Sequence, residues 1–319
     1  MDATSHAKQV RNTLLLALAA LIWGTAFAAQ SVGSGFVGPY TFLAMRSWLA
    51  CLFLFILLLV QGKLRTYQHA HPVVPPDKRV IALGGLCCGV MLFAASAAQQ
   101  AGISTTSTAK ASFLTALYVI LVPVCGIFTR RRPGLRVWLC VGVSVVGLYL
   151  LCLAGKGSLA LSGGEWLLLL GALLFCFQIL LVGHFSPRMD GIQLSLGQFL
   201  TTAVLSTIFM LLFEHPTWAA ISDAGFSILY CGIFSSGIAY TLQIVGQKGL
   251  DPTIASMAMC LESVFGALAG WVILGQTLAP PELAGCLLMF AAIVAAQLPD
   301  RRTAKAAAQP VAANRTSDE

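Results

Sequence analysis

The chain has 319 residues, of which 58% are hydrophobic and only 10% are charged, and its mean hydropathy is +0.84. Soluble domains carry about 25% charged residues, so this composition excludes a water-soluble enzyme and predicts an integral membrane protein. The net charge of +7 comes from Lys and Arg residues in loops between apolar segments, which predicts no nucleic acid partner.

Apolar runs of about the length that crosses a bilayer recur along the whole chain. They cover residues 13–30, 39–60, 80–98, 108–128, 135–153, 165–184, 193–213, 226–245, 252–274 and 281–298. We therefore predict an all-α, polytopic membrane protein with about ten transmembrane helices. The first run continues directly into a second and lacks a cleavage site, so we expect it to be retained as a helix.

Positive charge is distributed very unequally between the two sides of this ten-helix topology. Apart from Arg46 and Lys110 inside predicted helices, every Lys and Arg except Lys156 falls on the side of the two termini. Because cytoplasmic loops retain positive charge, both termini are expected in the cytoplasm. Residues 1–12 form the predicted N-terminal tail, and the Ala-rich, polar residues 299–319 form a predicted disordered C-terminal tail.

The chain contains a weak internal repeat. The aligned pairs include, at an offset of 147 residues, Gln100 with Gln247 and Thr106 with Thr253, and, at an offset of 152, Trp23 with Phe175 and Arg46 with Gln198. These matches predict two five-helix repeats, residues 13–154 and 163–298. Because five is odd, the second repeat enters the membrane in the inverted orientation, an arrangement with which transporters open a central cavity to alternate sides. A duplicated bundle without transport activity is the alternative.

Several short motifs follow one another in both halves. They are Leu-Ile-Trp-Gly-Thr-Ala-Phe at 21–27, the stretches 39–46 and 118–123, and the stretch 262–275. In order and spacing they resemble the EamA family of the drug/metabolite transporter superfamily. The resemblance implies ten helices in a duplicated unit, cytoplasmic termini, and export or exchange of small metabolites across the bacterial inner membrane. Gln276 stands where the family has Glu, and Ser263 where it has Pro.

Ionisable side chains inside predicted helices are functional candidates, because each costs about 3 kcal/mol at the bilayer centre. Lys110 lies near a helix start, where it can snorkel to the interface, whereas Arg46 and Glu262 lie deeper. A low-dielectric interior disfavours a charged carboxylate, so Glu262 can take up a proton on one side and release it on the other. The alternatives are substrate binding by Glu262 and a static, structural pair in which Arg46 or a helix-end donor holds the carboxylate.

Amide and aromatic side chains share one face of the predicted eighth helix. Tyr240, Gln243 and Gln247 are spaced by three and four residues, as ligand-lining positions on a helix are. Further candidates for a pocket in the middle of the membrane are Trp23, Gln100, Gln178 and Gln198. The alternative for each Gln is an interhelical hydrogen bond, worth about 0.6 kcal/mol.

Two motifs of the Gly-xxx-Gly type, at 85–89 and 266–270, permit close helix contacts. They are interpreted as packing sites, with a sliding contact or a homodimer face as alternatives. Pro123, inside the fourth predicted helix, indicates a kink there.

Phosphate-loop, zinc-protease and serine-hydrolase motifs are missing, and the ten cysteines lie in apolar stretches, so we expect no cofactor and no metal. The sequence therefore predicts a secondary transporter that exports a small metabolite, such as an amino acid or a related amphipathic compound, by proton antiport. The alternatives are an intramembrane enzyme acting on lipid and a non-transporting scaffold or sensor. The expected partners are the substrate and the lipid bilayer, with a homodimer as a further possibility.

Overall fold

The computed structural model describes residues 3–67, 77–106, 108–128, 134–152, 163–274 and 279–297. Within these ranges the secondary structure is helical and contains no strand. Seven helical segments are long and apolar enough to cross a membrane, and three shorter apolar segments occupy other predicted positions. The prediction of an all-helical membrane protein is confirmed, while the count of ten membrane-crossing helices stays a prediction.

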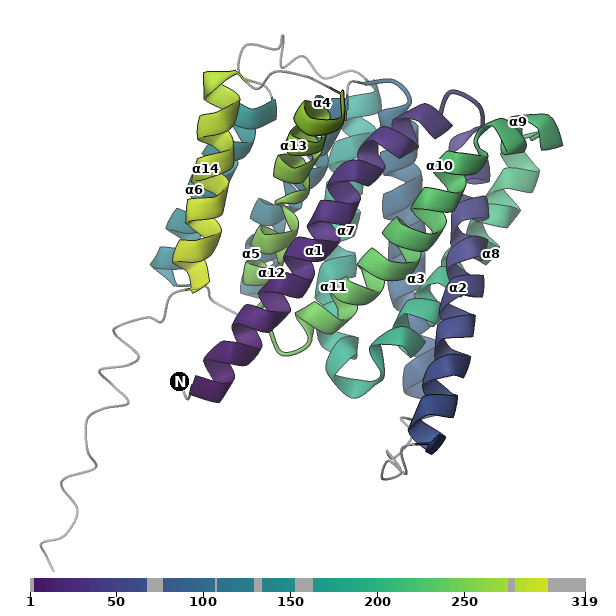
Figure 1. Ribbon diagram of the computed structural model, residues 1–319, viewed down its shortest axis with the longest axis horizontal. Coiled ribbons are helices and arrows are strands. Elements are labelled where there is room, and N and C mark those ends of the chain that lie inside the picture. Colours follow the sequence, from purple (N-terminus) through teal and green to yellow (C-terminus); the bar gives the residue numbers. More distant parts are fainter. Residues whose placement is uncertain are drawn as a thin grey trace, which may run out of the picture.

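The helices are named in chain order (Figure 1). The first half contains α1 (Ala3–Gly33), α2 (Pro39–Tyr67), α3 (Lys78–Ile103), α4 (Thr108–Ala116), α5 (Tyr118–Phe128) and α6 (Leu135–Cys152). The second half contains α7 (Gly163–Phe185), the short η1 (Ser186–Arg188), α8 (Gly191–Phe213), α9 (Trp218–Asp223), α10 (Gly225–Tyr230), η2 (Cys231–Ala239), α11 (Tyr240–Gln247), α12 (Pro252–Met259), α13 (Glu262–Leu274) and α14 (Pro280–Gln297). Helix α1 begins within the predicted N-terminal tail, and the predicted C-terminal tail lies outside the described residues.

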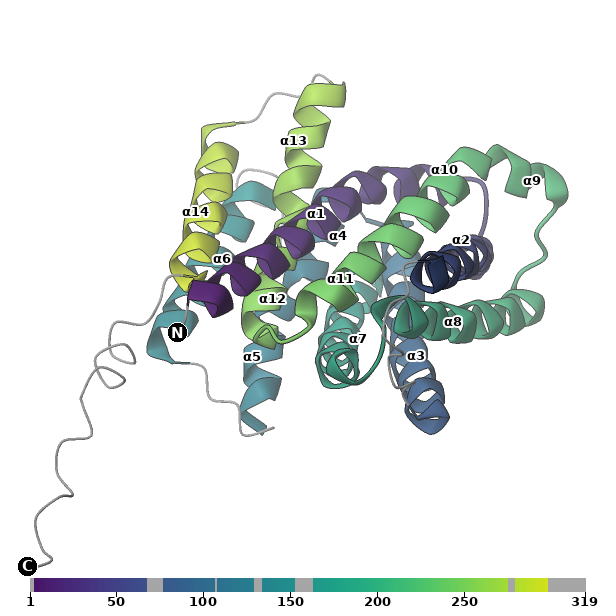
Figure 2. The ribbon, with the colours of Figure 1, turned by 60° about the horizontal axis from the view of Figure 1, so that its bottom comes forward.

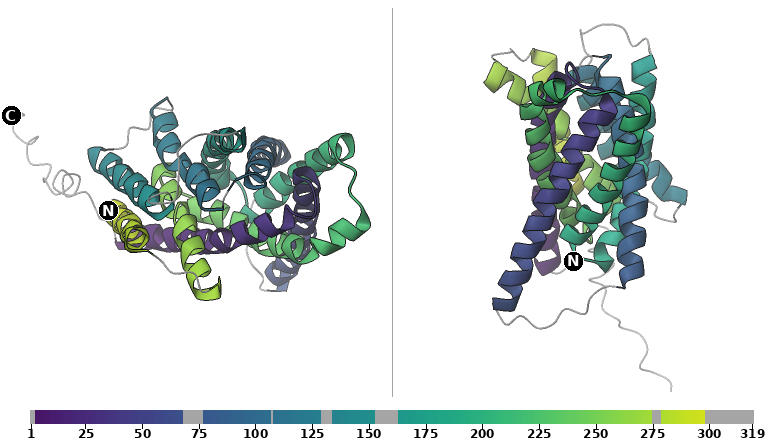
Figure 3. Two further views of the ribbon diagram at one scale, coloured as in Figure 1. Left: turned by 90° about the horizontal axis from the view of Figure 1, so that it is seen from above. Right: turned by 90° about the vertical axis from the view of Figure 1, so that its right-hand side faces the viewer.

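Contacts between the two halves occur in related pairs. Helix α6 packs on α14 at one end of the bundle, and α2 packs on α8 toward the other (Figures 1 and 2). Helix α1 packs along α10, η2 and α11, just as α3 packs along α7, and α1 contacts α13 as α7 contacts α4 and α5. Each contact thus has a counterpart when the halves are exchanged, as a duplicated unit related by a two-fold axis requires. Viewed from above, the bundle is elongated, with α14 toward one end and α9 at the other (Figure 3).

The first Gly-xxx-Gly motif packs inside the chain. A Cβ atom on Gly85 would lie only 2.9 Å from the Cα atom of Gly197, so α3 and α8 approach with their backbones nearly in contact. Close backbone approach of this kind is how small residues stabilise helix pairs in membranes. The motif is therefore occupied by α8 of the same chain, as the packing interpretation predicted.

A carboxylate from another helix end caps the N-terminus of α2. Glu214, the residue that follows α8, accepts hydrogen bonds from the backbone N–H groups of Tyr40 (2.9 Å) and Thr41 (2.8 Å) and from the Thr41 hydroxyl (2.5 Å). The first N–H groups of a helix have no partner within the helix, and its positive dipole end favours an anion. Glu214 therefore fastens the end of α8 to the start of α2.

We expect the substitution Glu214→Ala to lower the free energy of unfolding by about 2 kcal/mol, because it leaves these donors without their acceptor. Thermal unfolding of the purified protein in detergent measures the effect. Asp223→Ala is the matched control, since Asp223 is exposed and follows Glu214 in the same connecting segment. Equal melting temperatures for the two variants would contradict the capping role.

Two predicted helices are interrupted in the structure. The fourth breaks at Leu117, between α4 and α5, and the ninth at residues 260–261, between α12 and α13. Both breaks tighten to i→i−3 backbone bonds, such as Ile120 N to Leu117 O (3.0 Å) and Ser263 N to Cys260 O (3.3 Å). The kink expected at Pro123 is not the break, because Pro123 lies inside α5.

The two breaks face each other across the interface between the halves. The Ser112 and Ser263 hydroxyls form a 2.5 Å hydrogen bond, and the Cys260 thiol lies 4.0 Å from the Ala116 carbonyl that the break exposes. Neither break contains Gly or Pro, so the local sequence does not predict it. The Cys260 thiol thus replaces the lost partner of the Ala116 carbonyl from the opposite helix, as a broken helix at membrane depth requires.

The eighth predicted helix is also irregular, because η2 is wound as a π-helix over Cys231–Ala239. Such segments are rare and often occur at functional sites. The backbone carbonyl of Ser235 in η2 accepts a 3.3 Å hydrogen bond from the indole N–H of Trp23 on α1. Helix α11 then continues the same segment and carries the polar face predicted from the sequence.

Candidate functional site

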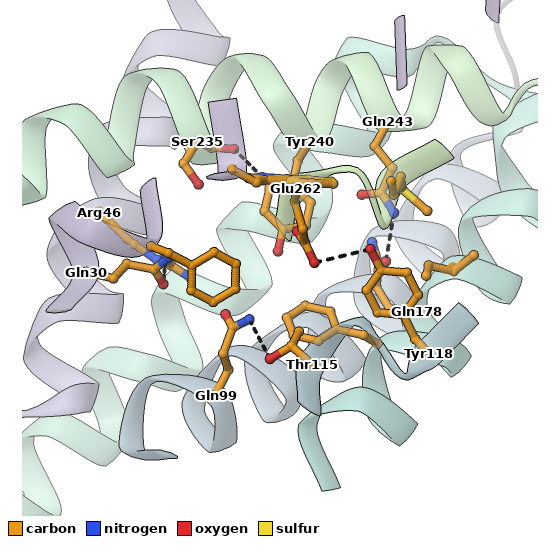
Figure 4. Close-up of a pocket in the computed structure, with 15 residues that line it drawn as sticks. Gln30, Arg46, Gln99, Thr115, Tyr118, Gln178, Ser235, Tyr240, Gln243 and Glu262 are labelled. Atoms are coloured by element: carbon orange, nitrogen blue, oxygen red, sulfur yellow. Dashed lines mark hydrogen bonds between the residues drawn. The ribbon is translucent and has the colours of Figure 1, made fainter. Parts of the chain in front are cut away.

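A cavity with an empty volume of about 490 Å³ lies between the two halves. Small-molecule sites combine an apolar wall with a few polar groups, and the lining of this cavity has that composition. Its lining residues come from α1, α2, α3, α4, α5, α7, η2, α11, α12 and α13 (Figure 4). They are Trp23, Phe27, Gln30, Arg46, Gln99, Thr115, Tyr118, Phe175, Gln178, Ile179, Ser235, Tyr240, Gln243, Met259 and Glu262.

Glu262 and Tyr118 both follow a helix break and both line the cavity. Each is the first residue of the helix that follows its break, α13 for Glu262 and α5 for Tyr118. Glu262 is 5% exposed, and its Oε1 accepts a hydrogen bond of 3.2 Å from the Tyr118 hydroxyl. Since Glu262 occupies a helix N-terminus, the α13 dipole also favours its carboxylate. One neutral donor from the first half therefore holds the acidic group of the second half.

Arg46 brings a positive charge into the same cavity from α2. Its side chain is 3% exposed, its Nη1 donates to Gln30 Oε1 at 3.0 Å, and its guanidinium carbon lies 5.9 Å from the centre of the Phe42 ring. Its Nε has no hydrogen-bond partner among the described residues. Arg46 and Glu262 both lie within the described ranges, and the hydrogen bonds of each go to neutral partners rather than to the other. The Arg46–Glu262 form of the structural alternative therefore does not occur in this geometry. Its other form, a helix-end donor, corresponds to the Tyr118 hydroxyl at the start of α5.

Three glutamines form a chain of amides at the other end of the cavity. Gln243 Nε2 on α11 donates to Gln178 Oε1 on α7 at 3.1 Å, and Gln178 Nε2 donates to Gln198 Oε1 on α8 at 3.3 Å. Gln178 and Gln243 line the cavity, and Gln198 is fully buried behind them. The site thus connects three helices of the second half through side-chain hydrogen bonds.

Two further predicted glutamines hold helices together outside the cavity wall. Gln100 Nε2 on α3 donates to the Gln30 carbonyl on α1, and Gln247 Nε2 on α11 donates to the Ile179 carbonyl on α7, both at 3.3 Å. The internal repeat aligns Gln100 with Gln247, and each joins the corresponding pair of helices in its half, although the accepting carbonyls are not aligned with each other. Gln100 and Gln247 thus make the interhelical hydrogen bonds that were the alternative to a place in the pocket.

Aromatic rings form the apolar part of the wall. The ring centres of Trp23 and Tyr240 are 4.9 Å apart at 63°, and those of Phe199 and Tyr240 are 5.3 Å apart at 82°. Edge-to-face contacts of this kind stabilise a fixed ring position. With Phe27 and Phe175, these rings offer an apolar surface beside the polar groups.

Most of the predicted site residues meet in this cavity. Glu262, Tyr240, Gln243, Trp23, Arg46 and Gln178 line it, whereas Gln100, Gln198 and Gln247 do not. Their roles stay predictions, since position alone does not establish function. The sequence analysis missed Tyr118 and Thr115, because hydroxyl groups are common in apolar helices. The repeat offset of 147 could have found Thr115, which aligns with Glu262 and accepts a 3.4 Å hydrogen bond from Gln99.

The polar groups are separated along the cavity. Arg46, Gln30 and Gln99 gather at one end, Gln178 and Gln243 at the other, and Glu262 lies between them (Figure 4). The cavity therefore offers one cationic group, Arg46, at one end, a carboxyl group in the middle, and amide groups at the other end. In the described part of the chain, His, Cys, Asp and Glu form no cluster suited to a metal ion.

Three known proteins that are similar to this chain are all named as transporters. A transporter from Archaeoglobus fulgidus, named as uncharacterized, is 25% identical over 91% of this chain and 87% of its own length. The uncharacterized transporter YoaV of Bacillus subtilis is 24% identical over 86% of this chain and 92% of its own length. The uncharacterized inner membrane transporter YicL of Salmonella typhimurium is 23% identical over 64% of this chain and 69% of its own.

The fold also has a precedent among solved structures. One crystal structure matches 92% of this chain, and 99% of its own chain, with a TM-score of 0.73 at 19% sequence identity. The model of the EamA-like transporter family matches twice, over residues 11–153 and 162–296, and thus covers both halves. The chain therefore belongs to the EamA-like transporter family, within the drug/metabolite transporter superfamily, as its sequence motifs indicated.

Proposed function

We propose that this protein is a secondary transporter that exports a small amphipathic metabolite across the bacterial inner membrane in exchange for protons. The metabolite carries a carboxylate and an amine, as amino acids do. The observation that carries the proposal is the presence of Arg46 and Glu262 in one buried cavity without a contact between them.

Two buried charges of opposite sign that do not neutralise each other favour a zwitterionic ligand. A buried charge without a counter-ion is expensive, and a substrate carboxylate at Arg46 would supply one. A substrate ammonium group at Glu262 would supply the other. The ring surfaces of Trp23 and Tyr240 provide room for an apolar side chain next to these groups.

Competition at Glu262 provides the coupling. The carboxyl group can bind a proton or a substrate ammonium group, but not both at the same time, so the two compete. The paired contacts between the halves support a cavity that opens to alternate sides. On the outer side, a proton then binds Glu262 as the substrate leaves. The result is antiport without any hydrolysis of ATP.

The distribution of charge supports the orientation. Lys8, Arg11, Arg188 and Lys248 lie at the end of the bundle that contains the start of α1, where the positive-inside rule places the cytoplasm. Arg46 lies near the start of α2, which is at the opposite end of the bundle (Figure 1). The proposed carboxylate site therefore lies toward the outside and the amide chain toward the cytoplasm.

Flux into and out of proteoliposomes tests the proposal. Vesicles loaded with radiolabelled amino acids, among them leucine, phenylalanine and alanine, are diluted into acidic or neutral buffer, with protein-free vesicles as the control. We expect efflux of at least one compound to accelerate when the outside is acidic, and a proton ionophore to remove the acceleration. Efflux equal to that of protein-free vesicles for every compound would overturn the proposal.

We expect Arg46→Met to weaken binding of leucine about tenfold or more, because a hydrogen bond to a charged group is worth about 1.5 to 3 kcal/mol. Binding of isoamylamine, which is leucine without its carboxylate, should change far less. Isothermal titration calorimetry on purified protein measures both dissociation constants, and Arg46→Lys serves as the variant that keeps the charge. An equal loss for the two compounds would show that Arg46 does not recognise the carboxylate.

A further inference from the structure

A glutamine holds the Arg46 side chain in the cavity. Gln30 on α1 is 5% exposed, and its Oε1 accepts a 3.0 Å hydrogen bond from Arg46 Nη1 (Figure 4). The other side of the same amide is also occupied, because Gln30 Nε2 donates to the Ala26 carbonyl in the preceding helical turn at 3.4 Å. A guanidinium group only donates and a carbonyl only accepts, so these two neighbours fix the orientation of the amide. Gln30 therefore meets Arg46 with its oxygen.

The segment of α1 that carries Gln30 is itself fixed in place. Gln100 Nε2 on α3 donates to the Gln30 backbone carbonyl at 3.3 Å. A Cβ atom on Gly33 would collide with the Phe42 ring, so this ring packs directly against α1. The same ring lies 5.9 Å from the guanidinium carbon of Arg46, a distance at which cation and ring attract each other. Two groups fixed against α1, an amide and a ring, thus restrict the position of the Arg46 head group.

The amide holds Arg46 without neutralising it. In the described part of the chain, the hydrogen bond of Arg46 goes to neutral Gln30, and the buried Nε of Arg46 has no partner. A carboxylate at position 30 would accept from the guanidinium group in the same way, but it would also occupy the positive charge. Gln30 therefore leaves both the charge and further N–H donors of Arg46 to a ligand in the cavity.

The second half of the chain has no counterpart of this pair. The repeat offset of 152 aligns Arg46 with Gln198 and Gln30 with Val182, which is fully buried in an apolar cluster. Contacts between whole helices recur in both halves, as a duplicated bundle requires. Because the Gln30–Arg46 pair occurs in one half alone, the packing of the repeat does not require it.

We infer that Gln30 is a positioning residue for recognition of the substrate carboxylate. It fixes the guanidinium group of Arg46 at the outer end of the cavity before the substrate arrives, so less ordering is needed on binding. As a neutral acceptor, it leaves the charge of Arg46 to the substrate. This inference rests on the proposed function, since it requires Arg46 to bind the carboxylate.

Leucine and isoamylamine, which differ only in the carboxylate, measure this role. The readout is the preference for leucine, the ratio of the two dissociation constants from titration calorimetry of the full-length protein. We expect Gln30→Met, which keeps the size of the side chain but removes the acceptor, to lower the preference about fivefold. Gln30→Glu keeps the shape and the acceptor but pairs with Arg46, so the preference should fall about tenfold or more. Melting temperatures establish that both variants are folded.

A double-mutant cycle shows whether Gln30 acts through Arg46. In the background of Arg46→Met, the guanidinium group is gone, so Gln30→Met should change the preference no further. A preference that Gln30→Met leaves unchanged, or lowers equally in both backgrounds, would overturn the inference. A wild-type preference in Gln30→Glu would overturn it too, because charge on the acceptor would then not matter. Equal weakening of both ligands is what a purely structural role predicts, and it would have the same consequence.

Failure of the inference is distinguishable from failure of the proposed function. If Arg46→Met lowers the preference for leucine but neither Gln30 variant does, Arg46 binds the carboxylate without help from Gln30, and the inference alone is refuted. If wild-type protein binds neither ligand, or binds leucine no more tightly than isoamylamine, the proposed carboxylate site is refuted and the inference with it.

Discussion

Replacement of Glu262 by Gln is expected to abolish the response of transport to a pH gradient. The Gln side chain has nearly the same shape as Glu and still accepts a hydrogen bond from Tyr118, but it cannot take up and release a proton. We expect efflux from proteoliposomes under an acid-outside gradient to fall to the rate measured at equal pH. Exchange of labelled for unlabelled substrate, which requires no net proton movement, should persist at a reduced rate, because the substrate ammonium group loses its charged partner.

Tyr118→Phe is the control for this experiment. It removes the hydroxyl that donates to Glu262 but leaves the carboxyl group in place, so the gradient response should remain. Size-exclusion profiles and melting temperatures establish that both variants are folded. A Glu262→Gln protein with a full gradient response would show that Glu262 is structural, and the proton would then have to bind elsewhere.

Replacement of Gly24 by Ala is expected to cause the largest loss of stability. A Cβ atom at this position would lie 2.6 Å from both the Glu262 carbonyl oxygen and the Gly266 nitrogen. These are backbone atoms of the neighbouring helix, which cannot turn aside as a side chain does, so α1 and α13 must separate. Overpacking of this kind costs about 1 to 3 kcal/mol, and we expect the upper end of that range. Thermal unfolding in detergent measures it.

Gly142→Ala provides the matched control, because a Cβ atom on Gly142 would meet nothing within 4 Å. The same change in side chain should therefore be neutral or slightly stabilising in α6, since Ala favours helices. If the two variants melted at the same temperature, the close contact between α1 and α13 would be refuted. The contact also has functional weight, because it joins the helix that carries Trp23 to the helix that begins with Glu262.

The helix breaks illustrate what could not be predicted from the sequence. Residues 108–128 and 252–274 were each expected to form one helix, and the only breaker recognised, Pro123, lies inside α5. The observed breaks contain no Gly or Pro, and the carbonyl of Ala116 at one break is met by the thiol of Cys260 from the other half. A break of this origin depends on a residue far away in the chain, so a local pattern carries no sign of it.

The roles of the glutamines likewise could not be predicted from the sequence alone. All of them cost free energy in a membrane, which is why the sequence alone indicated them as candidates. Gln178 and Gln243 line the cavity, while Gln100 and Gln247 join neighbouring helices outside it. Their sequence contexts do not distinguish these roles, because the difference lies in which neighbouring helix each side chain meets.

The sequence by itself determined the membrane class, the positions of the apolar segments, the family and the two deep charges. These follow from composition, from segment length and from the cost of burying a charge, all of which can be evaluated along the chain without knowing its fold. The tertiary structure alone decided that Arg46 and Glu262 share a cavity but have separate partners, and that Gln178, Gln198 and Gln243 meet in one chain of amides. Those features depend on distances between helices of the two halves, and only the packed bundle sets such distances.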